Sequence, residues 1–290
     1  MKEKRSWTEK YRPKNIYEVY GEHEFLNSLI TESLPHLIFV GPSGTGKTSQ
    51  AEAICKKIAK EYINENCSDY NGIDTIRNKI QRFCTLKISG LKCIILDEAD
   101  FLSYDAQRAL RNLIEYHSST TRFIILCNNL QKLIDGLQSR CMRFTFPAIP
   151  YEFFKQKANE VAQNEEITID NDTLQVLFQR TKGDLRQMIT LLEYHAPDIN
   201  QDTILQGTGI PYKEDVIHIL HNPMKNYLDE LLDQKQVHIT SLVQSIAEYI
   251  DSKNRKVFSQ LAELERHKKA GVQEQILRHY LIYILSTIQT

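Results

Sequence analysis

The residues best suited to chemistry lie between Gly41 and Thr48, where the chain reads Gly-Pro-Ser-Gly-Thr-Gly-Lys-Thr. This G-x-x-x-x-G-K-T spacing is typical of a phosphate-binding loop, and it stands between a short apolar segment and a segment with helical periodicity. The glycines let the backbone turn its N–H groups toward an anion at the start of a helix. Lys47 is expected to reach the β- and γ-phosphates of ATP, and the Thr48 hydroxyl to ligate Mg²⁺. The loop residues of this predicted site are Gly41, Pro42, Ser43, Gly44, Thr45, Gly46, Lys47 and Thr48.

Two carboxylates follow a second apolar segment about fifty residues later, where the chain reads Lys-Cys-Ile-Ile-Leu-Asp-Glu-Ala-Asp. An ATPase with a phosphate-binding loop needs two such acids, because one holds Mg²⁺ through water and the other polarises the attacking water. We assign the first role to Asp97 and the second to Glu98, since neighbouring side chains of a strand point in different directions. Asn128 ends a third apolar segment and is a candidate to lie between these acids and the γ-phosphate. The alternative for Asn128 is an ordinary turn after a strand.

The alternation of apolar strands with helical periodicity predicts an α/β fold, with a mostly parallel sheet covered on both faces. After Pro147 every segment is expected to be helical, and Asp184 is expected to be an N-cap. The predicted domains are an ATPase domain over 1–147, a three-helix lid over 148–207 and an all-α oligomerisation domain over 208–290. Strands are expected at 37–40, near 62–63 and at 92–97, 122–127 and 142–146. Helices are expected at 22–33, 49–60, 73–84, 104–116, 151–165, 170–181 and 184–195, with four or five more from 212 to 290.

Composition restricts the partners and the compartment. The 290 residues include 36 lysines and arginines and 37 aspartates and glutamates, so the net charge is −1. This balance gives no overall attraction to nucleic acid, and binding to DNA would need a local patch or several subunits acting together. The six cysteines form no C-x-x-C pair, which argues against a structural zinc site or a disulfide framework. Because the sequence has neither a secretory signal nor an apolar run of membrane-spanning length, we expect a cytosolic or nuclear protein with no membrane partner.

These motifs resemble those of the small subunits of replication factor C, the AAA+ sliding-clamp loader of eukaryotes, archaea and some large DNA viruses. The resemblance spans nearly the whole chain and is densest from Trp7 to Arg186. It implies a P-loop AAA+ domain, a three-helix lid and a helical collar. The segments that carry it are Glu9-Lys10-Tyr11-Arg12-Pro13, Val19-Tyr20-Gly21, the phosphate loop, Asn66-Cys67-Ser68-Asp69, Leu96-Asp97-Glu98-Ala99-Asp100, Asn128, Ser139-Arg140-Cys141 and Gly183-Asp184-Leu185-Arg186.

The resemblance also implies roles for individual residues. Asn128 matches the first sensor residue of the family, and Arg186 matches the second. Arg140 lies in the most specific signature, and the resemblance implies that it completes the ATP site of the neighbouring subunit. Such an arginine stabilises charge on the transferring phosphoryl group and makes hydrolysis depend on assembly. The residues expected near the adenine are Tyr11, Arg12, Val19 and Tyr20.

A DNA-facing surface is implied as well. In the family, helices like those expected at 73–84 and 104–116 line the inside of a spiral of subunits and follow the duplex backbone. Contacts of this kind do not depend on base sequence and weaken with salt. Asn71 and Asn112 stand where the family often has arginine, and the second strand follows the phosphate loop so closely that we expect it to be trimmed. The candidates for contact with DNA are Arg77, Arg82, Arg108 and Arg111.

The implied function is that of an ATPase subunit in a heteropentameric loader of replication factor C subunits. The loader opens a ring-shaped sliding clamp of the PCNA type and releases it on primer-template DNA as ATP is hydrolysed. The compartment would be the nucleus in a eukaryote, and the cytoplasm in an archaeon or at a cytoplasmic viral replication site. Two alternatives stay open: another AAA+ replication or recombination ATPase, such as an initiator or branch-migration motor, and a scaffold subunit that binds ATP without hydrolysing it. The intact Lys47, Asp97 and Glu98 argue against the scaffold.

Overall fold

The computed structural model describes residues 6–21, 34–69, 73–201, 203–204, 209, 211–235, 237–250 and 255–287. The chain forms two compact units, one made of residues 1–164 and 181–193 and the other of residues 165–180 and 194–290. The helix expected at 22–33 and most of the boundary expected at 207–211 lie outside the described residues. The helices expected to form a lid are divided between the two units, so the division into three domains stays a prediction.

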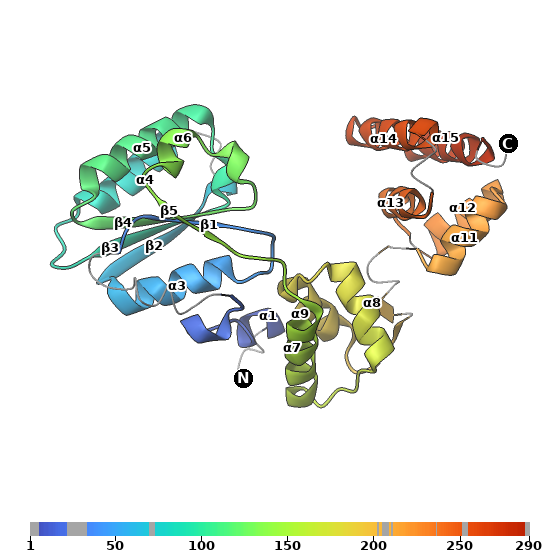
Figure 1. The fold of residues 1–290 in the computed structure, drawn as a ribbon, viewed down its shortest axis with the longest axis horizontal. Helices are drawn as coiled ribbons and strands as arrows, with labels where there is room; N and C mark the ends of the chain where they lie inside the picture. Colours follow the sequence, from blue (N-terminus) through green and yellow to red (C-terminus); the bar gives the residue numbers. More distant parts are fainter. Residues whose placement is uncertain are drawn as a thin grey trace. The chain divides into compact units, whose positions relative to one another are not determined.

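The first unit is built on a parallel sheet of five strands in the order β2-β3-β4-β1-β5 (Figure 1). Strand β1 lies between β4 and β5 and pairs with both, and Leu37 lies opposite Ile124 on one side and Met142 on the other. This arrangement confirms the predicted parallel sheet. Because the strands are parallel, the carboxyl ends of β1, β3 and β4 lie along the same side of the sheet. Ligands bind beyond these strand ends in sheets of this type. The strands are β1 (Leu37–Val40), β2 (Glu61–Asn66), β3 (Lys92–Asp97), β4 (Thr121–Cys127) and β5 (Met142–Thr145).

Each face of the sheet carries its own hydrophobic cluster, because successive side chains of a strand point to opposite faces. Ile38 belongs to the cluster formed with α4 and α5, whereas its neighbours Leu37 and Phe39 belong to the cluster formed with α3. Figure 1 shows α4, α5 and α6 on one face of the sheet and α3 on the other. The strands are therefore buried on both sides. These helices are α3 (Lys47–Ile58), α4 (Ile73–Thr85), α5 (Tyr104–His117) and α6 (Asp135–Gln138).

Strand β2 corrects one expectation. The sequence predicts a strand near 62–63, but β2 has six residues and pairs along its whole length with β3, from Glu61 opposite Lys92 to Asn66 opposite Asp97. That it is trimmed relative to the family stays a prediction. Its sequence, Glu-Tyr-Ile-Asn-Glu-Asn, is polar because β2 has only one neighbour in the sheet and only Glu65 is buried. Edge strands commonly carry charged and polar side chains, so hydrophobicity alone underestimates their length.

A buried glutamine joins α5 to the segment that leads from β4 to α6. The Gln107 amide donates to the carbonyl oxygens of Leu102 at 3.1 Å and Lys132 at 2.9 Å, and its oxygen accepts from the Ile134 N–H at 2.8 Å. The three side-chain bonds therefore satisfy two carbonyl oxygens and one N–H group that have no partner within a helix or a strand pairing. Short helical turns complete the first unit: α1 (Trp7–Lys10), η1 (Ile16–Glu18), η2 (Cys67–Asp69), η3 (Ala99–Phe101) and η4 (Leu130–Lys132).

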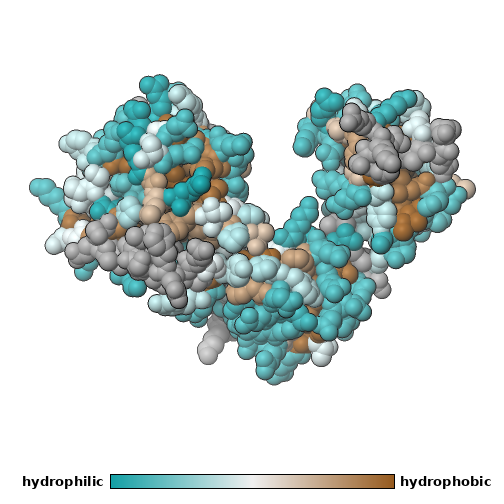
Figure 2. Space-filling model, viewed as in Figure 1, coloured by the Kyte–Doolittle hydropathy of each residue, from teal (hydrophilic) through white to brown (hydrophobic). Residues whose placement is uncertain are grey.

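After β5 the regular elements of the described residues are all helices, as expected. In the second unit, apolar side chains at helical spacing form one core, in which Leu228, Leu242, Leu264 and Leu281 are fully buried. Figure 2 shows hydrophobic residues between hydrophilic ones on the visible face of this unit. Of the helices after β5, α7 and most of α9 belong to the first unit. The helices after β5 are α7 (Tyr151–Asn164), α8 (Asn171–Thr181), α9 (Leu185–His195), α11 (Lys213–His221), α12 (Lys225–Asp229), the π-helical segment η5 (Glu230–Gln234), α13 (Ile239–Tyr249), α14 (Arg255–Lys269) and α15 (Glu274–Ser286).

Two further observations concern the cysteines and the length of the helices. All six cysteines are free thiols, and all but Cys141 are buried. In the described part of the chain, no helix combines the length and the apolar content that crossing a membrane requires.

Candidate nucleotide-binding site

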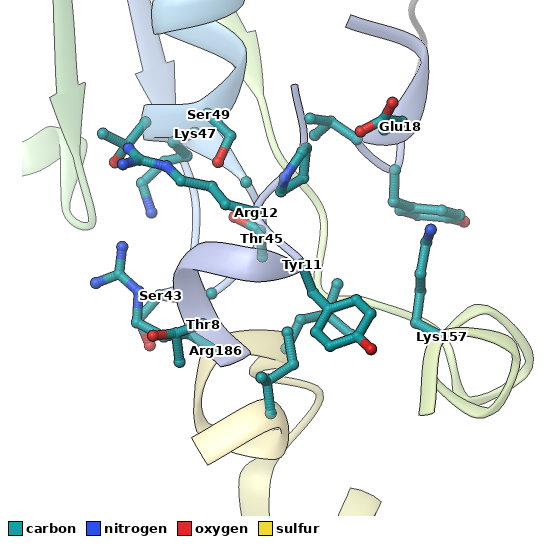
Figure 3. A pocket seen from close by; sticks show the side chains of 18 of the residues that line it. Thr8, Tyr11, Arg12, Glu18, Ser43, Thr45, Lys47, Ser49, Lys157 and Arg186 are labelled. Carbon is teal, nitrogen blue, oxygen red and sulfur yellow. The ribbon is translucent and has the colours of Figure 1, made fainter. Parts of the chain in front are cut away.

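The residues that follow β1, β3 and β4 line a cavity of about 730 Å³ in the first unit (Figure 3). This volume lies within the range of roughly 300–1,000 Å³ that is usual for ligand pockets. Its walls are the phosphate loop, the segment from 8 to 20, the ends of β3 and β4, and one face each of α7 and α9. In the view of Figure 3, Lys47 and Arg186 lie on one side of the cavity and Tyr11 and Lys157 on the other. The first side therefore offers two cations to a phosphate, and the second offers the aromatic ring of Tyr11 next to Lys157, which is paired with Glu160.

Two glycines show why the phosphate loop needs this residue type. Gly44 has a φ of +67° and Gly46 a φ of +93°, a region that side chains rarely adopt. The space is closed as well. A Cβ on Gly46 would lie 2.6 Å from Cγ1 of Val19, and a Cβ on Gly44 would lie 2.0 Å from Oδ1 of Asp184. The loop is thus packed between the N-terminal segment and the start of α9, and a side chain at either glycine would displace it.

The Lys47 ammonium is held at the centre of the site. Its Nζ donates to the carbonyl oxygens of Gly41 at 2.8 Å and Pro42 at 2.6 Å, and to Oδ1 of Asn128 at 3.0 Å. Burial lowers the pKa of Lys47, and the nearby carboxylate of Asp97 opposes that shift. The bond to Asn128 links the end of β4 to the phosphate loop, so the predicted sensor position lies where the γ-phosphate would meet Lys47.

Thr48 and Asp97 meet as the sequence predicts. Oδ2 of Asp97 accepts from the Thr48 hydroxyl at 2.7 Å, and Oδ1 accepts from the Glu98 N–H at 2.9 Å. A hydroxyl and a carboxylate are oxygen donors of the kind that Mg²⁺ uses together with phosphate oxygens and water. The described residues contain no group of three His, Cys, Asp or Glu side chains that could hold a metal without such a ligand. The Thr48 hydroxyl and the Asp97 carboxylate fit a Mg²⁺ ion whose other ligands are phosphate oxygens and water.

Glu98 lines the cavity in an unusual backbone conformation. Its φ is +54° and its ψ is +38°, in the left-handed region, which costs a residue other than glycine on the order of 1–3 kcal/mol. The turn lets the chain leave β3 with Asp97 directed at Thr48 while the next carboxylate enters the cavity separately. Backbone strain of this kind is common at functional sites, and the separate roles of the two acids stay a prediction.

Arg186 lies in the first turn of α9 and lines the cavity, and Asp184 caps the same helix. Oδ1 of Asp184 accepts from the Gln187 N–H at 2.9 Å, which confirms the predicted N-cap. Its other oxygen, Oδ2, accepts from the Ser43 hydroxyl at 2.6 Å. One carboxylate therefore ties the helix that carries Arg186 directly to the phosphate loop, a link that the sequence did not suggest.

The N-terminal segment supplies the other end of the cavity. Tyr11, Arg12, Val19 and Tyr20 all line it, as predicted. The Arg12 guanidinium forms an ion pair with Glu52 of α3 at 2.9 Å, and the Tyr20 ring packs against Phe153 of α7 with its centroid 4.9 Å away. The segment is thereby fixed to helices on either side of the cavity.

Sequence reasoning missed the residues that α7 and α9 add to the cavity. Lys157 and Glu160 of α7 form an ion pair at 2.8 Å in its wall. In the sequence these residues appear only as polar and apolar positions on one face of a helix. Such a face cannot be distinguished from the ordinary surface of an amphipathic helix. The added residues are Lys157, Glu160, Val161, Leu185, Met188 and Ile189.

Arg140 and the DNA candidates do not line the cavity. Arg140 lies between α6 and β5 and bonds with Glu115 of α5. Arg82 and Arg108 are exposed on α4 and α5, on the same face of the sheet, and the Arg108 guanidinium lies 5.9 Å from the centre of the Tyr104 ring. Arg111 donates to Oδ1 of Asn112 at 3.2 Å. The side chain of Arg77 lies outside the described residues, as does Asn71, and contact of this surface with DNA stays a prediction.

Known proteins similar to this chain include an ATPase family and several replication factor C subunits. The AAA family, described as the ATPase family associated with various cellular activities, matches residues 37–148. The chain is 40% identical to the replication factor C small subunit of Thermoplasma volcanium, across 77% of this chain and 75% of that protein. It is 35% identical to the corresponding subunit of Archaeoglobus fulgidus, across 97% of each chain. It is 33% identical to replication factor C subunit 3 of Schizosaccharomyces pombe, across 97% of this chain and 90% of that one.

Solved structures extend the likeness to a more distant group. A RuvB variant from Thermotoga maritima matches with a TM-score of 0.56 and 18% identity, across 82% of this chain and 89% of that chain. The Thermotoga maritima RuvB Holliday junction branch migration motor matches with a TM-score of 0.53 and 18% identity, across 79% and 86%. At this identity the likeness shows a shared fold, with the ATPase core followed by helices.

Proposed function

Because the chain belongs to the replication factor C small-subunit family, we propose that it hydrolyses ATP as one subunit of an assembly that loads a sliding clamp onto primer-template DNA. A single observation carries the proposal. In one cavity the chain bonds Lys47 to Asn128 and Thr48 to Asp97, whereas Arg140 is exposed and does not line that cavity. Each chain thus has the groups for binding ATP, and its Arg140 is available to the ATP site of a neighbouring subunit.

The cavity residues divide the work of hydrolysis. Lys47 would exchange its bonds to the loop carbonyls for bonds to the β- and γ-phosphate oxygens, which repays its burial. Thr48 and Asp97 would hold Mg²⁺, which neutralises charge on the phosphates when bound. Glu98 would orient and polarise the attacking water, and Asn128 would fix the position of the γ-phosphate opposite it. These steps need positioning and charge more than covalent chemistry.

Arg140 would complete the site of the neighbouring subunit. A second cation on the γ-phosphate stabilises the charge of the transition state, and arginines of this kind raise GTPase rates by roughly three to five powers of ten. Arg186 would act within its own chain, because the phosphate loop and α9 are already joined through Ser43 and Asp184. Its first-turn position lets a bound phosphate change the placement of the helix, a common type of nucleotide switch.

DNA would be met by the exposed cations of α4 and α5. Arg82 and Arg108 are exposed on helices that cover one face of the sheet. With a net charge of −1, a single chain attracts DNA weakly, so a surface that repeats this pair in every subunit is needed. Such contacts recognise the backbone of a duplex without reading its sequence.

The experiment measures steady-state ATP hydrolysis by the purified chain alone, with its candidate sister subunits, and with clamp and primed circular DNA added. We expect low activity from the chain alone and a rise only when partners, clamp and primed DNA are all present. The Glu98→Gln variant in the same mixture controls for activity that comes from the other subunits. Deposition of the clamp on the primed circle is measured in parallel.

Two results would contradict the proposal. One is the absence of clamp deposition when all partners are present and each is active. The other is strong hydrolysis by the isolated chain that does not respond to clamp, which would favour a self-assembling motor.

A further inference from the structure

The side chain of Arg140 is fixed by its own chain rather than free at the surface. Its Nε and Nη2 atoms both bond with Oε1 of Glu115, at the C-terminal end of α5. On the other side, Nη1 donates to the Gly136 carbonyl at 2.8 Å and to the Ser139 hydroxyl at 3.3 Å. The arginine is therefore gripped by α5 and by the end of α6, although 35% of its side chain is exposed.

The pattern of these bonds leaves one direction open. A guanidinium has five N–H donors in a rigid fork. The contacts with Glu115, Gly136 and Ser139 use the Nε hydrogen, both Nη1 hydrogens and one of the two on Nη2. The second Nη2 hydrogen has no acceptor among the described residues. An arginine meant to meet a phosphate from another molecule would need a free N–H of this kind.

Stability gives no sufficient reason for this pair. Glu115 and Arg140 are 48% and 35% exposed, and ion pairs at such sites contribute little to folding, because water screens the charges and the two side chains lose rotamer freedom. That same loss of freedom has a use at a catalytic site. A side chain that is already held in one geometry loses little more when it meets its target.

We propose that Glu115 is a positioning residue for Arg140, which sets the guanidinium in the orientation that reaches the nucleotide of the neighbouring subunit. The inference rests on the role of Arg140 proposed above. Glu115 itself would not touch that nucleotide, because its carboxylate lies against the Nε side and phosphate would repel it. In the opposite role, Glu115 would keep Arg140 away from the neighbouring subunit. Removing Glu115 would lower kcat at the neighbouring site in the first role and raise it in the second.

The test uses the assembled oligomer, arranged so that hydrolysis occurs only at the site that faces Arg140 of this chain. We expect Glu115→Ala to lower kcat at that site by about 10- to 100-fold, the loss that a misplaced catalytic group causes, while KM for ATP changes within about threefold. Glu115→Gln keeps an acceptor oxygen but no charge, so it should fall between Glu115→Ala and the unchanged chain. In the Arg140→Ala background, Glu115→Ala should have no further effect, because its only route to the site is gone.

Asp105→Ala is the matched control. It removes an exposed carboxylate from the first turn of the same helix, about 15 Å along the axis from Glu115, and should leave kcat at the neighbouring site unchanged. Thermal unfolding of Glu115→Ala should match that of the control, which shows that the loss is not a folding defect.

Three outcomes separate the inference from the proposed function. If Arg140→Ala lowers kcat but Glu115→Ala leaves it unchanged, the inference is wrong and the proposed function stands. If Glu115→Ala raises kcat, Glu115 withholds the arginine and the inference is again overturned. If Arg140→Ala has no effect, the role of Arg140 fails and the positioning role falls with it.

Discussion

Two regions of the same α/β unit treat their charges in opposite ways. In the cavity, Lys47 and Asp97 each bond to neighbouring residues of the site, and only 8% of Lys47 is exposed. On the face covered by α4–α6, Arg82 and Arg108 are exposed, and Arg140 keeps one N–H without an acceptor in the described part of the chain. The first region buries its charges in bonds within the chain, whereas the second leaves cations exposed, even where the chain holds one of them in place, as it does Arg140.

This difference separates two kinds of functional surface. A buried charge must be paired or it costs several kcal/mol, so the cavity is set for one ligand that replaces existing bonds. An exposed arginine keeps its hydration and can meet a ligand that another molecule brings. The contrast explains why ATP binding belongs to one chain while hydrolysis and DNA contact are expected to require several.

Glu98→Gln gives the largest effect expected within the cavity. The amide keeps the shape of the side chain but cannot polarise water, so hydrolysis at this site should fall by roughly 10²- to 10³-fold. ATP affinity should change little, since Lys47, Thr48 and Asp97 remain. The measurement pairs single-turnover hydrolysis with binding of a fluorescent ATP analogue. Equal loss of binding and hydrolysis would show that Glu98 supports the fold of the cavity instead.

His36 lies just before β1, at the end of the strand away from the cavity. We expect its role to be structural, and its titration offers a test. Its Nδ1 accepts from the Phe123 N–H at 3.1 Å, and burial, followed by the charge of Arg122, lowers its pKa from 6.5 to about 4. A lowered pKa means that its contribution to stability is complete above pH 6.5 and is lost as the pH falls from 6.5 toward 4. The loss should approach about 3 kcal/mol.

Urea unfolding at pH 7 and pH 4.5 checks this, with His36→Gln as the comparison. Glutamine can accept the same bond and does not titrate, so its variant should lose less stability over this range than the unchanged chain. Identical losses in the two proteins would show that other groups cause the acid sensitivity.

Asp184 tests the link between the phosphate loop and α9. Asp184→Ala removes both the cap and the bond from Ser43, and should lower the free energy of unfolding by about 1 kcal/mol. Asp184→Asn keeps the cap but removes a negative charge that acts on Lys47. It should bind ATP about two- to fivefold more tightly, as expected from loss of one partly exposed charge. Weaker binding by Asp184→Asn would mean that the carboxylate itself is needed for nucleotide.

Arg108→Gln tests the outward-facing charge and should have the smallest effect. Each phosphate contact adds about 0.9 to the slope of log K against log salt for duplex DNA. The assembled protein carrying the substitution in this chain should therefore show a slope less steep by about that amount. Arg266→Gln removes an exposed cation from α14 and serves as the control. Equal slopes for Arg108→Gln and the unchanged protein would remove Arg108 from the DNA surface.

The cavity could be predicted from sequence because its chemistry requires fixed residue types at fixed spacing. Gly46 and Lys47 had to be neighbours, and Asp97 had to end a strand that lies beside β4. The parallel sheet followed from apolar segments whose residues alternate between two buried faces. The polar edge strand β2 could not be predicted in full, since Glu65 and its neighbours show no apolar pattern.

The remaining parts of the site depend on contacts between distant segments. Ser43 and Asp184 are 141 positions apart, and Glu115 meets Arg140 only because α5 and α6 pack together. Neither pair has a local signature, because any exposed acid and any exposed donor look alike in a sequence. Lys157 entered the cavity for the same reason, through the packing of α7.

The most direct test of the account is the paired measurement of Arg140→Ala in the assembled oligomer. ATP binding by the cavity of the variant chain is measured together with hydrolysis in the adjoining subunit. The account predicts unchanged binding and a loss of about 10³-fold or more in the neighbour's hydrolysis, with Arg140→Lys failing to restore it, since lysine lacks the fork that Glu115 grips. Loss of ATP binding by the variant chain itself, with hydrolysis in the adjoining subunit unchanged, would contradict it.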